Sequence, residues 1–162
     1  MNCFVQFTDG TVKQYGSLRL VTGIFQQPHL VADDNVVIPA TAIKAYQNKE
    51  YYAVSQKTFT KVAKSYVAVE ALPGFAVRVI TGRLNVYSLK YYNGHNTTEK
   101  LFLQSGEEGQ ILPCSADALT GLVKDNSEAV AVLQSKSKML TGTKKLLTVV
   151  DVYNNSKLIT KN

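Results

Sequence analysis

Short β-forming runs separated by turn signals fill the first two thirds of the chain, and this pattern constrains the fold more than any other feature. Cys3, Val5 and Phe7 alternate with Phe4, Gln6 and Thr8 in the first of these runs, and Asp9 and Gly10 follow it. Asp-Gly between two such runs predicts a hairpin with a type I′ turn, in which both central residues have positive φ. Similar runs continue to residue 104, with further turns predicted at residues 33–35, 72–74, 81–83, 93–94 and 106–109.

Two positions are expected to interrupt these strands. Gly16 and Ser17 are expected to bend the second strand. Pro39 has no N–H to donate to a central ladder, so we expect the chain to turn there or to start a short helical turn. The strands follow one another without intervening helices, which predicts an antiparallel β-sheet or a small barrel over residues 3–112.

The hydrophobic period changes to that of a helix after residue 114. Ser115 is a good N-cap for a first helix, and Ser127 is expected to cap a second helix with Lys136 and Lys138 in its last turn. A third helix is predicted from Thr143 to residue 155, with an apolar stripe of Leu146, Leu147, Val150 and Tyr153. Short helices need packing partners. We therefore expect an α+β fold in which two or three C-terminal helices cover the sheet.

The length of 162 residues predicts a single globular domain over residues 1–162. A subdivision is expected into a small β-barrel-like part (1–56), β-hairpins (57–112), a helical cap (113–155) and a tail (156–162). The longest apolar runs are far shorter than the ~20 residues that span a bilayer.

Chemistry-bearing motifs are not found in this sequence. It contains no GxSxG elbow and no glycine-rich phosphate loop. His29 and His95 are the two histidines, and we expect them at a strand edge and in a polar turn. Cys114 precedes the first predicted helix, whose dipole would lower its thiol pKa, but no base is identified beside it. We therefore expect no enzyme, no catalytic residues and no cofactor.

The cysteine and acidic residues do not show the spacing of a metal site. Cys3 and Cys114 allow either one disulfide or two thiols. Two cysteines and two histidines do not make a structural zinc site without carboxylates, and no CxxC motif exists. The carboxylate pairs at residues 33–34 and 107–108 lack the spacing of a calcium loop. We expect no metal site.

Tyrosines and lysines are the candidate interaction residues. Two adjacent pairs, Tyr51 with Tyr52 and Tyr91 with Tyr92, each place one ring on each face of a strand, so one ring of each pair is expected to be exposed or half exposed. Exposed rings stack on bases or sugars, and cross-strand packing is the alternative explanation. The net charge of +6 is spread evenly over both halves, yet lysines concentrate near the C-terminus. These lysines attract phosphates or form a solvated helical face; the candidates are Lys136, Lys138, Lys144 and Lys145.

Eight short segments of the sequence carry a resemblance to known proteins, at residues 20–25, 28–33, 46–48, 52–55, 72–78, 82–87, 101–106 and 150–155. Together they resemble a group of uncharacterised bacterial envelope or secreted proteins. Members of that group begin with a small Sm-like or SH3-like β segment and end in a helical segment that closes on a Tyr-Asn pair. The resemblance covers most of the chain and implies an exported location, but it carries no functional residues.

These observations predict a non-catalytic binding or scaffolding domain of the bacterial envelope or a secreted protein. It would offer sheet edges and exposed tyrosines to a protein or glycan partner. The alternative is a basic small β-barrel that binds nucleic acid. We expect a periplasmic or secreted location if a signal peptide has been trimmed, and a cytoplasmic one otherwise. No transmembrane segment is expected.

Overall fold

The computed structural model describes residues 2–23, 25–59, 69–70, 72–92, 94–136 and 142–156. They form strands β1 (Cys3–Phe7), β2 (Val12–Tyr15), β3 (Leu18–Gly23), β4 (Gln26–Ala32), β5 (Val36–Pro39), β6 (Ile43–Gln47), β7 (Tyr52–Ser55), β8 (Val69–Glu70), β9 (Phe75–Ile80), β10 (Leu84–Tyr92), β11 (Thr97–Ser105) and β12 (Leu112–Pro113). The helices are the short 3₁₀ turns η1 (Ala40–Ala42) and η2 (Gln56–Thr58), followed by α1 (Ala116–Leu122), α2 (Ser127–Gln134) and α3 (Gly142–Asn155).

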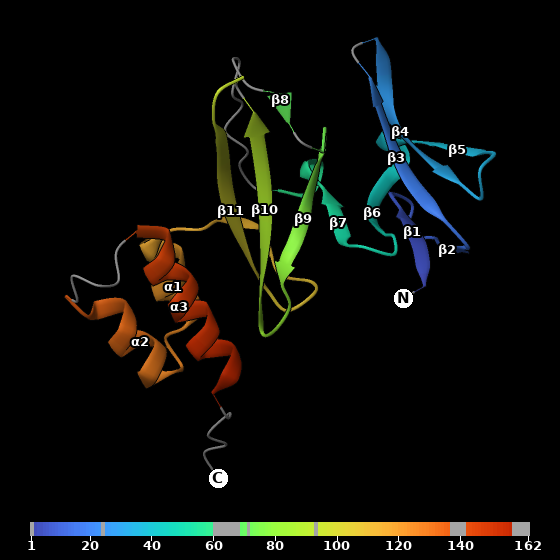
Figure 1. The fold of residues 1–162 in the computed structure, drawn as a ribbon. Helices are drawn as coiled ribbons and strands as arrows, with labels where there is room; N and C mark the ends of the chain where they lie inside the picture. The colour runs from blue at the N-terminus through green and yellow to red at the C-terminus, as the bar shows by residue number, and fades with distance from the viewer. Residues whose placement is uncertain are drawn as a thin grey trace.

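The described strands make two antiparallel sheets. The larger has the order β12-β11-β10-β9-β7-β6-β1-β2, with β8 also paired to β10, and the smaller has the order β3-β4-β5. Figure 1 shows the smaller sheet at one side of the molecule and the helices at the other, with β9, β10 and β11 between them. The predicted α+β class is confirmed. Of the two predicted forms the open antiparallel sheet is present, because the described strands do not close into a barrel.

A bend between β2 and β3 carries the chain from one sheet to the other. The backbone N–H groups of Gly16 and Ser17 donate to Oδ1 of Asp33 at 2.8 and 2.9 Å. The N–H of Asp33 in turn donates to the carbonyl of Ser17 at 3.2 Å. One hydrophobic core lies between the two sheets and contains Cys3, Val5, Leu18, Leu30, Ile43, Tyr46 and Phe75. The predicted bend therefore shapes the whole N-terminal half.

The type I′ turn is found at a different hairpin from the one predicted. Of Asp9 and Gly10, only Gly10 has positive φ (89°), and its N–H donates to the carbonyl of Phe7. This loop matches a type I turn closed by a glycine bulge, the usual solution for three loop residues. Asp33 and Asp34 both have positive φ, at 48° and 62°. Aspartate tolerates this conformation, and the carboxylate of Asp33 is held by the bend described above.

The predicted helices are present, with small shifts at their ends. Ser115 caps α1, and its Oγ accepts from the N–H of Ala118 at 3.1 Å. The cap of α2 is Asn126 rather than Ser127, because its amide oxygen accepts from the N–H of Ala129 at 2.8 Å. Because α2 ends at Gln134, Lys136 follows the helix instead of lying in its last turn. No helix among the described residues is long and apolar enough to cross a membrane.

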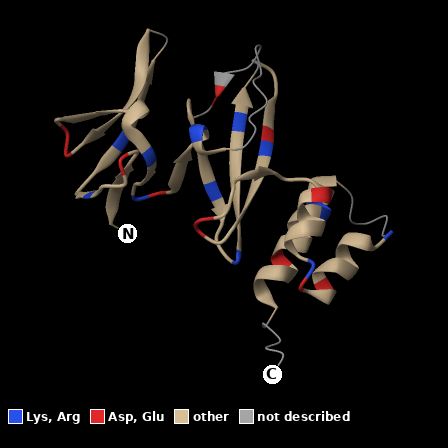
Figure 2. Ribbon diagram, turned by 180° about the vertical axis from the view of Figure 1, so that it is seen from behind, with Lys and Arg blue, Asp and Glu red and all other residues tan. Residues whose placement is uncertain are grey.

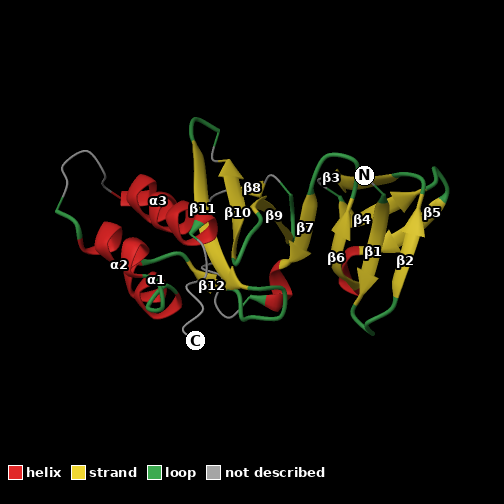
Figure 3. Ribbon diagram, turned by 90° about the horizontal axis from the view of Figure 1, so that it is seen from below, coloured by secondary structure: helices red, strands yellow, loops and turns green. Residues whose placement is uncertain are grey.

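The helices cover one face of β10 and β11 near one end of the sheet, as the view from below shows (Figure 3). The end of α3 is tied to β10 by Asn154, whose amide accepts from the N–H of Leu84 at 2.8 Å and donates to its carbonyl at 2.9 Å. A Cβ on Gly82 would overlap the Asn154 amide, which explains glycine there. The core beneath consists of Leu84, Val86, Leu103, Leu119, Val123, Ala129, Val149, Val150 and Tyr153.

Replacement of Asn154 by alanine is expected to loosen the helices from the sheet. Leu84 would lose partners for both backbone groups in a partly buried place, so we expect Asn154→Ala to lower the free energy of unfolding by about 1–3 kcal/mol. Urea denaturation measures this change. The matched control is Asn155→Ala, which removes only an exposed hydrogen bond to Asp151 and should stay within about 0.5 kcal/mol of the wild type. Equal losses in both variants would contradict the assignment.

Candidate functional site

The structure separates the four candidate tyrosines and leaves one of them widely exposed. Tyr91 is 3% exposed and Tyr92 is 54% exposed, so the predicted alternation of this pair is confirmed. Tyr51 and Tyr52 are both half-buried. The Tyr51 hydroxyl lies 3.2 Å from that of Tyr46. The ring of Tyr52 lies under the guanidinium of Arg78 at 4.2 Å.

The described candidate lysines, Lys136, Lys144 and Lys145, lie on the helical part, away from the tyrosines. Lys136 and Lys144 are exposed, and Lys138 lies outside the described residues. The ammonium of Lys145 donates to the carbonyl of Ser135 at 2.6 Å, where it caps the end of α2. Figure 2 shows basic and acidic residues interspersed over both halves of the ribbon. The predicted tyrosines and lysines therefore do not form one continuous surface.

The two cysteines are free thiols in separate places. Cys3 belongs to the core between the sheets, whereas Cys114 packs against the core beneath the helices. Burial raises the pKa of the Cys114 thiol to about 11, so the lowering expected from the nearby helix is wrong. Among the described residues, no three histidine, cysteine or acidic side chains are placed to hold a metal ion.

A groove of about 500 Å³ runs beside β3 and contains Tyr51. The successive residues Ser17, Leu18, Arg19 and Leu20 all line it. Because neighbouring side chains of a strand point to opposite faces, a groove lined by successive residues follows the edge of the strand. The opposite wall and floor are Asn48, Lys49, Glu50, Tyr51 and Leu72.

The wall opposite β3 is fixed by the turn between β6 and β7. The amide oxygen of Asn48 accepts from the N–H groups of Glu50 and Tyr51 at 2.9 and 2.8 Å. The Tyr51 ring packs edge-on against the fully buried Tyr46, with ring centroids 5.9 Å apart. These contacts hold the Tyr51 ring in place at the groove. Lys49 and Glu50 remain exposed on its rim.

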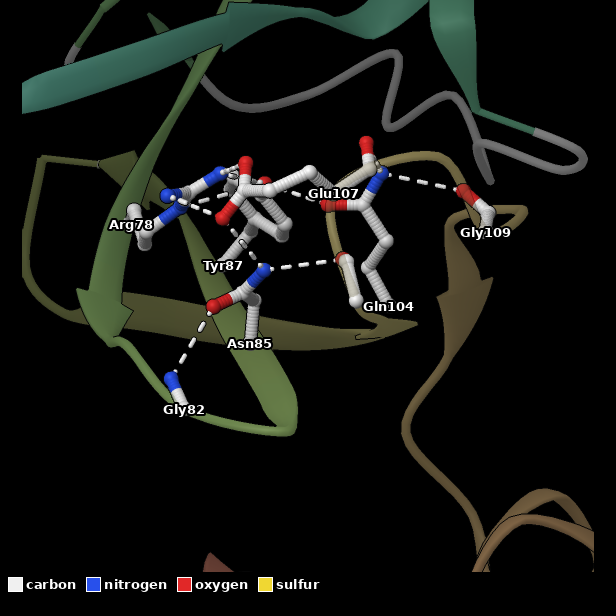
Figure 4. Close-up of polar contacts among 8 residues, drawn as sticks. Arg78, Gly82, Asn85, Tyr87, Gln104, Glu107 and Gly109 are labelled. Atoms are coloured by element: carbon white, nitrogen blue, oxygen red, sulfur yellow. Dashed lines mark hydrogen bonds and ion pairs between the residues drawn. The ribbon is translucent and has the colours of Figure 1, made fainter.

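A second hollow, about 180 Å³, lies on the face of the sheet opposite the helices and has a polar floor. Arg78 of β9 is 11% exposed and makes a two-pronged ion pair with Glu107, with distances of 3.0 and 2.6 Å. Its Nε and Nη2 also donate to the hydroxyl of Tyr87, which donates to Oε1 of Gln104 at 2.6 Å. Figure 4 shows these side chains converging from neighbouring strands and, for Glu107, from the turn that follows β11.

The same network holds the turn at residues 106–109, which forms one wall of this cavity. The amide of Gln104 donates to the carbonyls of Glu107 and Gly109 at 3.0 and 2.9 Å. The amide of Asn85 donates to the carbonyl of Gly106 at 3.0 Å (Figure 4). The hydrogen bond from Arg78 lowers the pKa of Glu107, so its carboxylate stays charged at neutral pH. Burial raises the pKa of Tyr52 to about 12, so its hydroxyl stays protonated.

Sequence reasoning missed most of this cavity. Arg78, Tyr87 and Gln104 lie on three strands, and only the strand register brings them together. Gln104 is a long polar residue in an otherwise apolar run, and it lies three residues before Glu107 at the predicted turn. That combination was the available signal, because a polar residue within a buried strand needs a nearby partner.

The thiol of Cys114 is expected to react slowly in the folded protein. With a pKa near 11, about one thiol in a thousand is ionised at pH 8, and the thiolate is the reactive species. We expect Cys3→Ser protein to be labelled by a disulfide reagent many times faster in denaturant than in buffer. A short cysteine peptide in the same denaturant is the control. Equal rates in the folded and denatured states would contradict the burial of this thiol.

Acid is expected to weaken the clamp on the turn. Because the pKa of Glu107 lies below its ordinary value of 4.5, the ion pair with Arg78 stabilises the fold above that pH and is lost as pH falls through the lowered value. We expect wild type to be more stable than Glu107→Gln at pH 7 and the difference to shrink in acid. Glu108→Gln, which removes the adjacent carboxylate, is the matched control. A pH-independent difference would overturn the assignment.

Comparison with known proteins gives no match. No family model matches the chain, and neither a curated protein nor a solved structure is similar to it at a significant level. The resemblance of its phrases to exported bacterial proteins stays a prediction, and the function has to be argued from the geometry of the groove and the cavity.

Proposed function

We propose that this chain is a non-catalytic binding domain that takes up an extended protein segment along the edge of β3. The observation that supports this most directly is the position of that edge: β3 is the terminal strand of its sheet, and its edge lies in the groove of about 500 Å³. A terminal strand presents unpaired backbone N–H and C=O groups. A segment added there gains main-chain hydrogen bonds and places alternate side chains in the groove.

The opposite edge of the small sheet, formed by β5, is less suited to pairing with an added strand. β5 has four residues, and it ends at Pro39, which lacks a backbone N–H. Short length and proline are two of the ways in which proteins protect exposed edges from pairing. β3 has six residues and no proline, so it offers the longer ladder.

The groove also supports a choice of partner chemistry. Leu20 and Leu72 are half-buried along it and leave apolar surface for a partner side chain. Arg19 and Lys49 add two positive charges, and Glu50 adds one negative charge. We therefore expect a segment with apolar residues at alternate positions and at least one carboxylate. An exported location, which the resemblance implies, belongs to the same proposal.

Selection of random displayed peptides on the full chain tests this function. A selected peptide should slow amide hydrogen exchange along β3. Replacement of Thr22, which lines the groove, by proline should weaken binding at least about tenfold, because proline has no N–H to donate to an added strand. Thr22 lies at an irregularity of the β3–β4 pairing, so the hairpin should tolerate the change, and Thr22→Ala controls for loss of the side chain.

The tyrosines provide a second, independent control. Tyr51→Ala should weaken peptide binding, because it removes a ring that lines the groove, and Tyr92→Ala should leave binding unchanged, because Tyr92 lies on β10. Protection of amides on β5 instead of β3 would overturn the choice of edge. If no peptide is selected, or if Thr22→Pro binds as well as Thr22→Ala, strand addition at β3 is wrong.

A further inference from the structure

The polar cavity has a floor, formed by Arg78, Tyr87 and Gln104, whose polar groups are hydrogen-bonded within the protein. The polar groups at its rim have no such partners in the part of the chain that the structure describes. The side chains of Arg78, Tyr87 and Gln104 form hydrogen bonds with one another and with the turn at residues 106–109. Four rim groups make no hydrogen bond or ion pair with any described residue. They are the amide of Gln6, the ammonium of Lys44, the hydroxyl of Tyr52 and the carboxylate of Glu108.

The rim groups come from two walls of opposite charge. Gln6 lies on β1, Lys44 on β6 and Tyr52 on β7, which are neighbours in the sheet. Glu108 lies on the turn that faces them across the cavity. Arg78 and Glu107 between them neutralise each other. One wall therefore offers a cation with two polar groups, and the other offers an anion.

From this arrangement we propose that the cavity binds a small zwitterion, a molecule that carries one carboxylate and one ammonium group. The carboxylate would face Lys44, Gln6 and the protonated Tyr52 hydroxyl, and the ammonium would face Glu108. Ionised partners make hydrogen bonds roughly twice as strong as neutral ones, so a ligand with both charges gains at both walls.

Size and rigidity agree with a small ligand. The cavity of about 180 Å³ corresponds to roughly six water molecules at about 30 Å³ each, which is room for a compact amino acid and not for a chain of sugars. The guanidinium of Arg78 covers a face of the Tyr52 ring at 4.2 Å, so that face is not free to stack on a sugar. The hydrogen bonds of the floor hold the backbone of the turn that carries Glu108 before a ligand arrives, which lowers the cost of binding on that side.

Titration with simple probes tests this proposal on the full chain. The probes are glycine and 4-aminobutyrate, which differ in the separation of their charges. Their binding is followed by NMR through the shifts of the protein's backbone amide signals. At least one of the two probes should give saturable shifts at residues 6, 44 and 106–109. Acetate and methylammonium, which carry one charge each, should bind at least about tenfold more weakly, since each loses a charged contact.

Two surface variants test whether the charged residues of the rim bind the zwitterion. Lys44→Met and Glu108→Gln should each weaken binding of the zwitterion at least about tenfold. Lys57→Met and Glu128→Gln, which change exposed charges outside the cavity, should leave it unchanged. The proposal is wrong if neither zwitterion gives saturable shifts, if acetate binds as tightly as glycine, or if the two rim variants bind like their controls. The groove beside β3 is lined by none of Lys44, Glu108, Lys57 and Glu128. The outcome of the peptide-binding test is therefore independent of the outcome of this one.

Discussion

The carboxylate of Asp33 holds the geometry on which the N-terminal half depends. It accepts from two successive backbone N–H groups, Gly16 and Ser17, and so fixes the point where the chain leaves one sheet for the other. Because the chain bends, β2 stays with β1 while β3 pairs with β4, and the edge of β3 is left facing the turn between β6 and β7.

A buried cation governs the middle of the molecule in a comparable way. Arg78 is too enclosed to be hydrated fully, and an unpaired buried charge is costly, so its neighbours have to supply acceptors. Tyr87 and Glu107 do so, and Gln104 completes the chain of hydrogen bonds. The need to satisfy one guanidinium thus positions the turn at residues 106–109, which builds a cavity wall. A structural requirement and a candidate binding site share the same side chains here.

The sequence predicts local features well and long-range features poorly. The first hairpin, the Ser115 cap and the period change near residue 115 depend on neighbouring residues, and the structure confirms them. The two residues of positive φ at Asp33 and Asp34 accompany a long-range contact, in which the Asp33 carboxylate accepts from Gly16 and Ser17, and local sequence does not reveal such a contact. The raised pKa of Cys114 likewise reflects burial against a core that residues far along the chain complete.

The groove and the cavity are joined by one predicted feature, the adjacent pair Tyr51 and Tyr52. Alternation along the strand places Tyr51 in the groove and Tyr52 in the cavity, so two hollows lie on opposite sides of the same stretch of backbone. The stretch that follows them is buried, with Ala53, Val54 and Ser55 at most 6% exposed, and this packing restrains movement of the shared wall. Two sites that share a rigid wall without sharing a side chain are free to bind different partners, because neither ligand needs to move the backbone that the other one contacts.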